Sequence, residues 1–257
     1  MEQVIIGANW KMHKTLEQAE HFLKEFLGHL PVLGRCRLFL AASYTHLSRL
    51  SRLTAGSTLL LAAQNVHWAE SGPYVGEISA RMLAEIGVDM VVIGHSQRRD
   101  QWGETDQMVN GKLRQSLAHD LQPLVCIGEH LEDKECGVSG EVLARQIKIA
   151  LRGIDAEMAK RVWIAYEPVW AIGEGATAAQ PEYAAEMHAL IRATLCDCLG
   201  LEAGDSIPIL YGGSVFLENA VGILKQPNVN GLFLARSGLE SESFIEIIGA
   251  VRSAGLA

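Results

Sequence analysis

The sequence predicts a closed (β/α)8 barrel. Short apolar runs recur along the whole chain and alternate with amphipathic helical patterns, as expected of strands separated by covering helices. The runs are apolar almost throughout, which is typical of parallel strands buried on both faces. The expected strands span residues 4–8, 37–41, 58–63, 90–93, 124–127, 162–166, 207–211 and 231–235.

The helical patterns between these runs place apolar residues three and four positions apart. In the segment 16–27, one face carries Ala19, Phe22, Leu23 and Phe26, with charged residues between them. This spacing is that of a helix with one buried face. The other clear patterns span residues 141–151, 183–199 and 244–251.

No feature of the sequence divides the chain into parts. It contains no run of like charges, no Pro/Ser-rich linker and no shift in composition. With 257 residues, 49% of them hydrophobic, it can bury a large core. Two smaller domains or an open doubly wound sheet are alternatives, but eight β/α units at this length favour one closed barrel. We therefore expect residues 1–257 to form a single domain.

Charge and cysteine content exclude several classes of protein. The net charge of -8 argues against a surface that binds nucleic acid, so an anionic substrate must be held by local features. The five cysteines lack the spacing of a disulfide framework, which indicates reduced thiols in the cytoplasm. The first residues run directly into a strand, and no apolar stretch is long enough to cross a bilayer. We therefore expect neither a signal peptide nor a membrane partner.

Polar residues follow several predicted strands, where a barrel places its chemistry. Asn9 and Lys11 follow the first strand, His95 the fourth and Glu167 the sixth, and a Gly-Gly-Ser loop, 212–214, follows the seventh. Each residue taken alone has an ordinary structural explanation, such as a surface lysine or a core histidine. Their alignment at one end of the barrel favours a common active site.

The segment after the sixth strand carries the candidate base. Glu167 stands at the strand end, and Pro168 keeps it out of the helical region. Bulky Val169, Trp170 and Ile172 follow, beside glycines, as in a lid that excludes water. Glu167 is the only carboxylate beside this loop, so we assign it as the general base.

His95 and Lys11 complete the predicted chemistry. A histidine at the start of a helix is disfavoured as the cation, so neutral His95 can donate a hydrogen bond to a carbonyl oxygen. Lys11 can stabilise a developing enediolate. These parts suit proton abstraction beside a carbonyl without a metal or an organic cofactor. The 212–214 loop, between a strand and a helix, predicts a phosphate site.

Six motifs, in order along the chain, resemble those of the triosephosphate isomerase family. The fold of this family is the TIM barrel. The family is also a well-known example of a Glu base that works with a neutral His. The motifs are Gly7-Ala-Asn-Trp-Lys-Met12, Ala63-Gln-Asn-Val66, Gly94-His-Ser-Gln-Arg-Arg99, Cys126-Ile-Gly-Glu129, Tyr166-Glu-Pro-Val-Trp-Ala-Ile-Gly173 and Tyr211-Gly-Gly-Ser-Val215.

The resemblance implies a role for each residue. Glu167 would move a proton between two carbons, His95 would polarise the carbonyl, and Lys11, positioned by Asn9, would stabilise negative charge. The phosphate would be held by Gly173, Ser214 and the backbone of Ala235 and Arg236, under a lid formed by residues 168–178.

The resemblance also implies a homodimer. The loop 67–76 would reach into the neighbouring subunit. Its tip, Pro73, Tyr74 and Val75, is apolar and suits burial against a partner.

Four positions depart from the family pattern: Gln97 where Glu is usual, Val75 where Thr is common, Glu174 in the lid, and Ala235 where Gly is usual. They leave two alternatives to isomerisation of dihydroxyacetone phosphate and D-glyceraldehyde 3-phosphate. One is an isomerase of a four-carbon sugar phosphate, erythrulose phosphate, and the other is a phosphate-binding barrel with impaired catalysis.

A further alternative, independent of these departures, is a retaining glycosidase with Glu129 and Glu167 as its carboxylate pair. The Gly212-Gly213 phosphate loop and the lack of aromatic residues at most strand ends argue against it.

Overall fold

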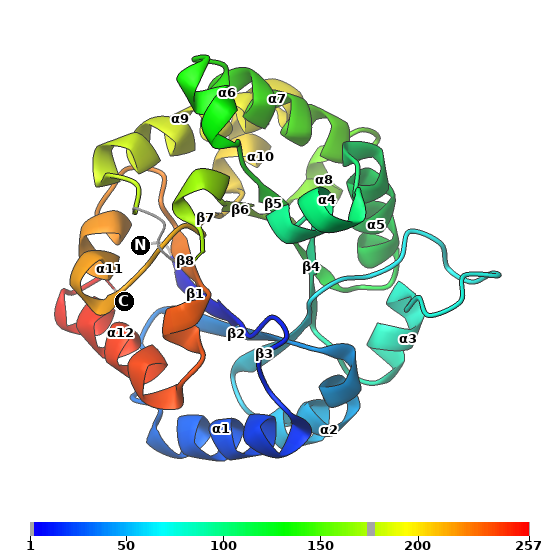
Figure 1. Cartoon of the computed structure of the whole chain (residues 1–257), viewed down its shortest axis with the longest axis vertical. Helices are drawn as coiled ribbons and strands as arrows, with labels where there is room; N and C mark the ends of the chain where they lie inside the picture. Colours follow the sequence, from blue (N-terminus) through cyan, green and yellow to red (C-terminus); the bar gives the residue numbers. More distant parts are fainter. Residues whose placement is uncertain (1–2, 174–177, 257) are drawn as a thin grey trace.

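Eight parallel strands close into a barrel in the order β1-β2-β3-β4-β5-β6-β7-β8, with β1 paired to β8. The computed structural model describes residues 3–173 and 178–256. The helices form a ring around the strands (Figure 1), which confirms the predicted fold class. The strands are β1 Val4–Asn9, β2 Cys36–Ala42, β3 Leu59–Ala63, β4 Met90–Ile93, β5 Gln122–Ile127, β6 Trp163–Tyr166, β7 Ile209–Tyr211 and β8 Gly231–Leu234.

The four helices with the clearest patterns are confirmed, and each is somewhat longer or shifted at its ends. The long helices are α1 Leu16–His29, α2 Tyr44–Thr54, α5 Asp106–Ala118, α7 Ser139–Ala150, α9 Pro181–Leu199, α11 Leu217–Leu224 and α12 Ser241–Ser253. Shorter ones are α3 Ala80–Glu85, α4 Ser96–Trp102, α6 Leu131–Glu135, α8 Ala156–Ala159, α10 Leu201–Ser206, and the 3-10 turns η1 Val169–Ala171 and η2 Arg236–Gly238.

Local signals explain where the helices begin. Thr15 caps α1: its hydroxyl accepts from the Gln18 N–H, and the Gln18 side chain accepts from the Thr15 N–H. Pro181 opens α9, where a missing N–H costs nothing. The buried face of α1 consists of Ala19, Phe22, Leu23 and Phe26, the residues that the spacing predicts.

Two apolar layers build the core. The inner layer fills the barrel, where Phe39 stacks on Phe233 with ring centroids 5.5 Å apart and lies 6.1 Å from Trp163. The outer layer lies between the strands and the helices and is much larger. The filled interior leaves the rim, where strands end and loops begin, as the place for a site. Among the described residues, no helix is both long and apolar enough to cross a membrane.

His188 makes the free energy of unfolding depend on pH. This α9 side chain is fully buried, with its ring near those of Tyr166 and Tyr211, and burial lowers its pKa from 6.5 to about 4. Between these two pKa values, His188 is therefore protonated in the unfolded chain but neutral in the folded chain. The stabilising difference is complete above about pH 6.5 and is lost as the pH falls toward 4. At about pH 5 the loss should be about 2 kcal/mol.

Urea unfolding at about pH 7 and about pH 5 measures this effect. Replacing His188 by Gln should flatten the decline in stability, whereas replacing exposed His21 by Gln should leave it as in the parent chain. An unchanged decline in His188→Gln would show that His188 does not carry it.

Candidate active site

The strand ends bring the predicted residues to one rim of the barrel. Lys11 lies two residues beyond β1, and His95 caps α4. Glu167 follows β6 directly. Ser214 lies in the loop after β7, and Ala235 and Arg236 follow β8.

His95 and Glu167 lie side by side, although they come from different strands. The His95 Nε2 and Glu167 Oε1 atoms are 3.3 Å apart, and the residues are 6% and 3% exposed. The backbone N–H of Ser96 donates to Glu167 Oε2 at 3.3 Å. A carboxylate and an imidazole in such dry surroundings are suited to proton transfer rather than to fold stability.

The hydrogen bonds of His95 define its tautomer. Its Nδ1 accepts from the Gln97 N–H at 3.1 Å, so the ring proton of the neutral form sits on Nε2, facing Glu167. Burial lowers the pKa of His95, nearby Glu167 opposes this change, and Lys11 adds to it. The helix predicted after His95 is confirmed, because α4 begins at Ser96. The geometry thus supplies a neutral hydrogen-bond donor.

The backbone around Glu167 is held from both neighbouring strands. The Glu167 N–H donates to Ile127 O at 2.7 Å, and the Gly212 N–H donates to Tyr166 O at 2.7 Å. A Cβ on Gly128 would lie 1.8 Å from Glu167 O, so only glycine fits there. The sequence alone does not reveal this constraint on Gly128, because the atom that a Cβ would meet belongs to a residue distant in sequence.

Lys11 adopts a backbone conformation that lysine rarely takes, with φ of 51°. Three groups hold it: Asn9 Oδ1 accepts from the Lys11 N–H at 2.9 Å, while Ser43 Oγ and Gln64 Nε2 donate to Lys11 O. Asn9 thus holds the backbone of Lys11 in this conformation. Among the described residues, the Lys11 ammonium group makes no ion pair with a carboxylate, which leaves it for a substrate.

The start of the loop 168–178 lies against the loops predicted to hold phosphate. Ala171 O accepts from the Ser214 hydroxyl at 2.8 Å and from the Ser214 N–H at 3.2 Å. Arg236 Nη2 lies 3.5 Å from Gly173 O. The predicted departure at Glu174, and residues 175–177 of the loop, lie outside the described residues. The Gly212 and Ser214 N–H groups are satisfied within the protein, so the phosphate role of Ser214 stays a prediction.

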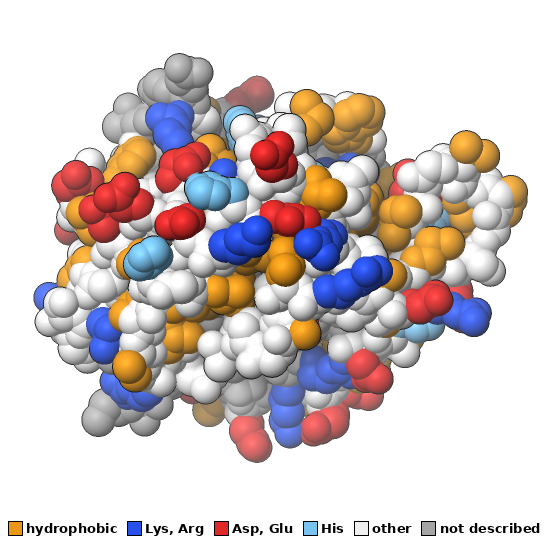
Figure 2. Space-filling view, turned by 90° about the horizontal axis from the view of Figure 1, so that it is seen from below, with side chains coloured by type: hydrophobic (Ala, Val, Ile, Leu, Met, Phe, Trp, Pro, Cys, Tyr) orange, Lys and Arg blue, Asp and Glu red, His pale blue; other side chains and the backbone are white. Residues whose placement is uncertain are grey.

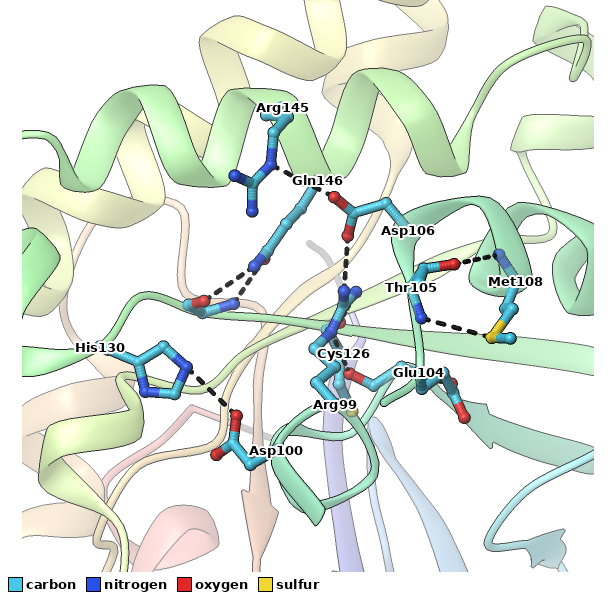
Figure 3. A network of polar contacts seen from close by, with 12 residues as sticks. Arg99, Asp100, Glu104, Thr105, Asp106, Met108, Cys126, His130, Arg145 and Gln146 are labelled. Atoms are coloured by element: carbon cyan, nitrogen blue, oxygen red, sulfur yellow. Dashed lines mark hydrogen bonds and ion pairs between the residues drawn. The ribbon is translucent and has the colours of Figure 1, made fainter. Parts of the chain in front are cut away.

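A polar network around Glu104 went unpredicted; Figure 3 shows part of it, with Glu104, Arg99 and Asp106 labelled. Glu104 is buried, accepts from the Gly94 N–H at 2.9 Å, and pairs with Arg98 and Lys112. Burial opposes its ionisation, but Lys112 and Arg98 together hold the pKa of Glu104 below its usual range. Nothing in the sequence distinguishes Glu104 from a surface carboxylate, since its partners meet only in the folded chain.

Arg99 ties this network to the neighbouring strand. Its Nε donates to Gly94 O at 2.7 Å, its Nη1 to Asp106 at 2.5 Å, and its Nη2 to Cys126 O at 3.3 Å. The strand end that carries His95 is therefore joined to β5, beside Glu167. Burial, then Glu167, raises the pKa of Cys126 well above its usual range. Cys126 therefore remains a neutral thiol close to Glu167.

Glu129 is fully buried, and three side chains donate hydrogen bonds to one of its carboxylate oxygens. Its Oε1 accepts from Tyr166 and Tyr183 at 3.0 Å and from Trp170 Nε1 at 2.8 Å. A carboxylate enclosed in this way cannot reach a sugar oxygen, so the glycosidase alternative lacks its acid. Within 3–173 and 178–256, no group of three or more His, Cys, Asp or Glu is arranged to hold a metal ion.

Comparison with known proteins agrees with this geometry. A family model described as triosephosphate isomerase matches residues 4–251. The chain belongs to the triosephosphate isomerase family. It is therefore an isomerase, as the motifs predict, and the matched residues span all eight strands.

Three relatives named triosephosphate isomerase illustrate the similarity. That of Flavobacterium johnsoniae is 39% identical over 251 residues, covering 98% of this chain and all of its own length. Those of Acetivibrio thermocellus and Caldanaerobacter subterraneus subsp. tengcongensis are each 40% identical, over 245 and 250 residues. They cover 95% and 96% of this chain, and 97% and 99% of their own lengths. None of these names points to a four-carbon substrate or to a protein that only binds phosphate.

Replacing Gly128 by alanine should lower the turnover number of the isomerase at least about 100-fold, because displacing Glu167 by about 1 Å misplaces the base. Steady-state kinetics measure the effect. Gly249 on α12 is the matched control, since a Cβ there meets nothing within 4 Å. Full activity in Gly128→Ala would mean that the position of the Glu167 backbone does not matter.

Proposed function

We propose that the chain interconverts dihydroxyacetone phosphate and D-glyceraldehyde 3-phosphate through an enediolate, as one domain spanning residues 1–257. The observation that carries this proposal is the buried His95–Glu167 pair, 3.3 Å apart at the rim of the barrel. Such a step belongs to glycolysis and gluconeogenesis. A cytoplasmic location is supported by five cysteines that are all free.

The proposed reaction moves one proton between adjacent carbons. The Glu167 carboxylate removes a proton from the carbon beside the carbonyl, and the electron pair flows to the carbonyl oxygen. The Nε2–H of His95 polarises that oxygen and exchanges protons between the two oxygens of the enediolate. Glu167 then returns its proton to the neighbouring carbon. Lys11 stabilises the negative charge throughout.

The phosphate of the substrate is assigned to the loops after β7 and β8. The proposed ligands are Gly173, Ser214, and the backbone of Ala235 and Arg236. The contacts of Ser214 and Arg236 with the start of the loop 168–178 support this placement, because they join the lid to the same loops. A closed lid would exclude water and limit loss of phosphate from the enediolate.

A homodimer formed through the loop 67–76 is also proposed. The loop projects from the barrel beside α3, with hydrophobic side chains gathered on the projection (Figure 2). The ring of His67 lies 4.1 Å from that of Trp68 and 4.2 Å from that of Tyr74, which stiffens the loop. Val75 is fully exposed at its tip. An ordered apolar projection of this kind suits burial against a second copy.

Replacing Glu167 by aspartate tests the assignment of the base. Shortening the side chain by one methylene should lower the turnover number on glyceraldehyde 3-phosphate at least about 100-fold, while KM changes little. A coupled assay measures both constants. Glu182→Asp, at the start of α9, is a control with the same chemical change. A turnover number equal to that of the parent chain would contradict the assignment of Glu167 as the base.

The same coupled assay, run with erythrulose phosphate, tests the substrate. Higher kcat/KM on the three-carbon substrate is expected. A higher kcat/KM on erythrulose phosphate would assign the chain to four-carbon sugar phosphates. No activity on either substrate would indicate a protein that only binds phosphate.

Sedimentation equilibrium at micromolar concentration should show a dimer. Replacing both Tyr74 and Val75 by aspartate should yield monomers, because two charges cannot be buried in an apolar contact. Val32→Asp is the control, since Val32 is also exposed but lies on a different loop. A monomeric parent chain, or a double variant that stays dimeric, would contradict the proposed interface.

A further inference from the structure

A small cavity lies beside Glu167, among the segments that follow β4, β5 and β6. Its volume is about 20 Å³, which is enough for one water molecule and too little for a larger ligand. Glu167 and Ser96 form part of its wall, together with Gly128 and Gln146, and all four residues are buried. The cavity thus belongs to the surroundings of the base.

The same cavity reaches the surface at His130 and Asp100. Among the described residues that line it, these two are the exposed ones. His130 Nε2 lies 3.2 Å from Asp100 Oδ1, with the side chains 55% and 40% exposed, and Figure 3 shows the two facing each other. Glu167, in contrast, is only 3% exposed. The cavity therefore connects a buried carboxyl group to a polar pair in contact with solvent.

The lining of the cavity suits a water molecule. It offers the carboxyl groups of Glu167 and Asp100, the hydroxyl of Ser96 and the ring of His130, and a buried water needs roughly two to four polar partners. Glu167 Oε2 accepts from the Ser96 N–H at 3.3 Å. A carboxylate oxygen has more than one acceptor site, so Oε2 can also bond to a water.

We propose that this cavity holds a water molecule through which Glu167 exchanges its proton with solvent during the reaction. The inference rests on the proposed function, in which Glu167 carries a proton between two carbons and is then a carboxylic acid. The acid gives its hydrogen to the water while the water gives one of its own to the other carboxyl oxygen. Two O–H bonds break, two form, and no charge is separated. The water then leaves past His130 and Asp100.

This route has a consequence for the product. While Glu167 holds the proton, the enediolate lies against its carboxyl group, so exchange on that side requires the intermediate to leave. Exchange through the cavity lets hydrogen from solvent enter the product while the intermediate stays bound. His130 and Asp100 touch no reacting atom and act only on the passage of water.

Conversion of glyceraldehyde 3-phosphate in deuterated water measures this exchange. The dihydroxyacetone phosphate formed is trapped by reduction, and NMR gives the ratio of deuterium from solvent to hydrogen carried over from the substrate. His130→Phe narrows the outer end of the cavity and should lower this ratio at least about 3-fold. His130→Ala widens it and should not lower the ratio. Because both isotopes compete for the same intermediate, the ratio does not depend on the amount of active enzyme.

His21→Phe, at an exposed histidine of α1, is the matched control and should keep the parental ratio. An unchanged ratio in His130→Phe would overturn the proposal. A fall in both His130 variants would also overturn it, because loss of the imidazole or damage to the fold acts in the same direction in both.

Hydrogen exchange of the Ser96 amide tests the cavity without turnover. This N–H donates to Glu167, and Ser96 lines the cavity. NMR of isotope-labelled protein should show its exchange with solvent at least about 10-fold slower in His130→Phe than in the parent chain, and no slower in His130→Ala. Unchanged exchange in His130→Phe would contradict the water route even in a chain that isomerises the substrate. Slower exchange in a chain that does not isomerise it would support the route and contradict the proposed function alone.

Discussion

The candidate active site depends on holding a carboxyl group, that of Glu167, where little water reaches it. Burying a lone carboxylate is costly, and a direct cation would quench its basicity. Here Glu167 has the Ser96 N–H and the neutral His95 ring as its neighbours, and neither partner carries a full charge. Both donors come from the first turn after β4, whereas Glu167 comes from β6. The site therefore exists only when the closed barrel sets these strand ends in register across β5.

The loops above the barrel form one connected structure. Trp10 Nε1 donates to Gly238 O at 3.2 Å, which joins the segment that carries Lys11 to the turn after β8. The Ser237 hydroxyl donates to Val215 O, which joins that turn to the loop after β7. Ser214 continues the chain of contacts to Ala171, close to the base. The groups proposed for charge stabilisation, phosphate binding and proton transfer are thus connected by hydrogen bonds from side chains to backbone carbonyl oxygens.

The fold and the rim residues were predictable because both follow from local patterns. Apolar runs of strand length mark the barrel, and the polar residue after each run marks the rim. Strand ends were less predictable: β7 begins at Ile209 rather than at residue 207, and β8 ends at Leu234, before Ala235 turns away. Contacts that arise only in three dimensions were not predictable at all. In the sequence, Glu104 and Lys134 look like ordinary surface charges. Only in the folded chain does Glu104 meet Lys112, and Lys134 meet Trp170.

The left-handed backbone conformation of Lys11 lowers the stability of the fold, although the proposed reaction needs the lysine side chain at this position. A residue with a Cβ in that conformation costs about 1 kcal/mol relative to glycine, which adopts it freely. Glycine would therefore relieve the backbone at a position where the proposed reaction requires a long cationic side chain. The hydrogen bonds from Ser43 and Gln64 offset that strain. Selection for stability alone would remove the lysine, so its presence in this conformation is itself a mark of activity.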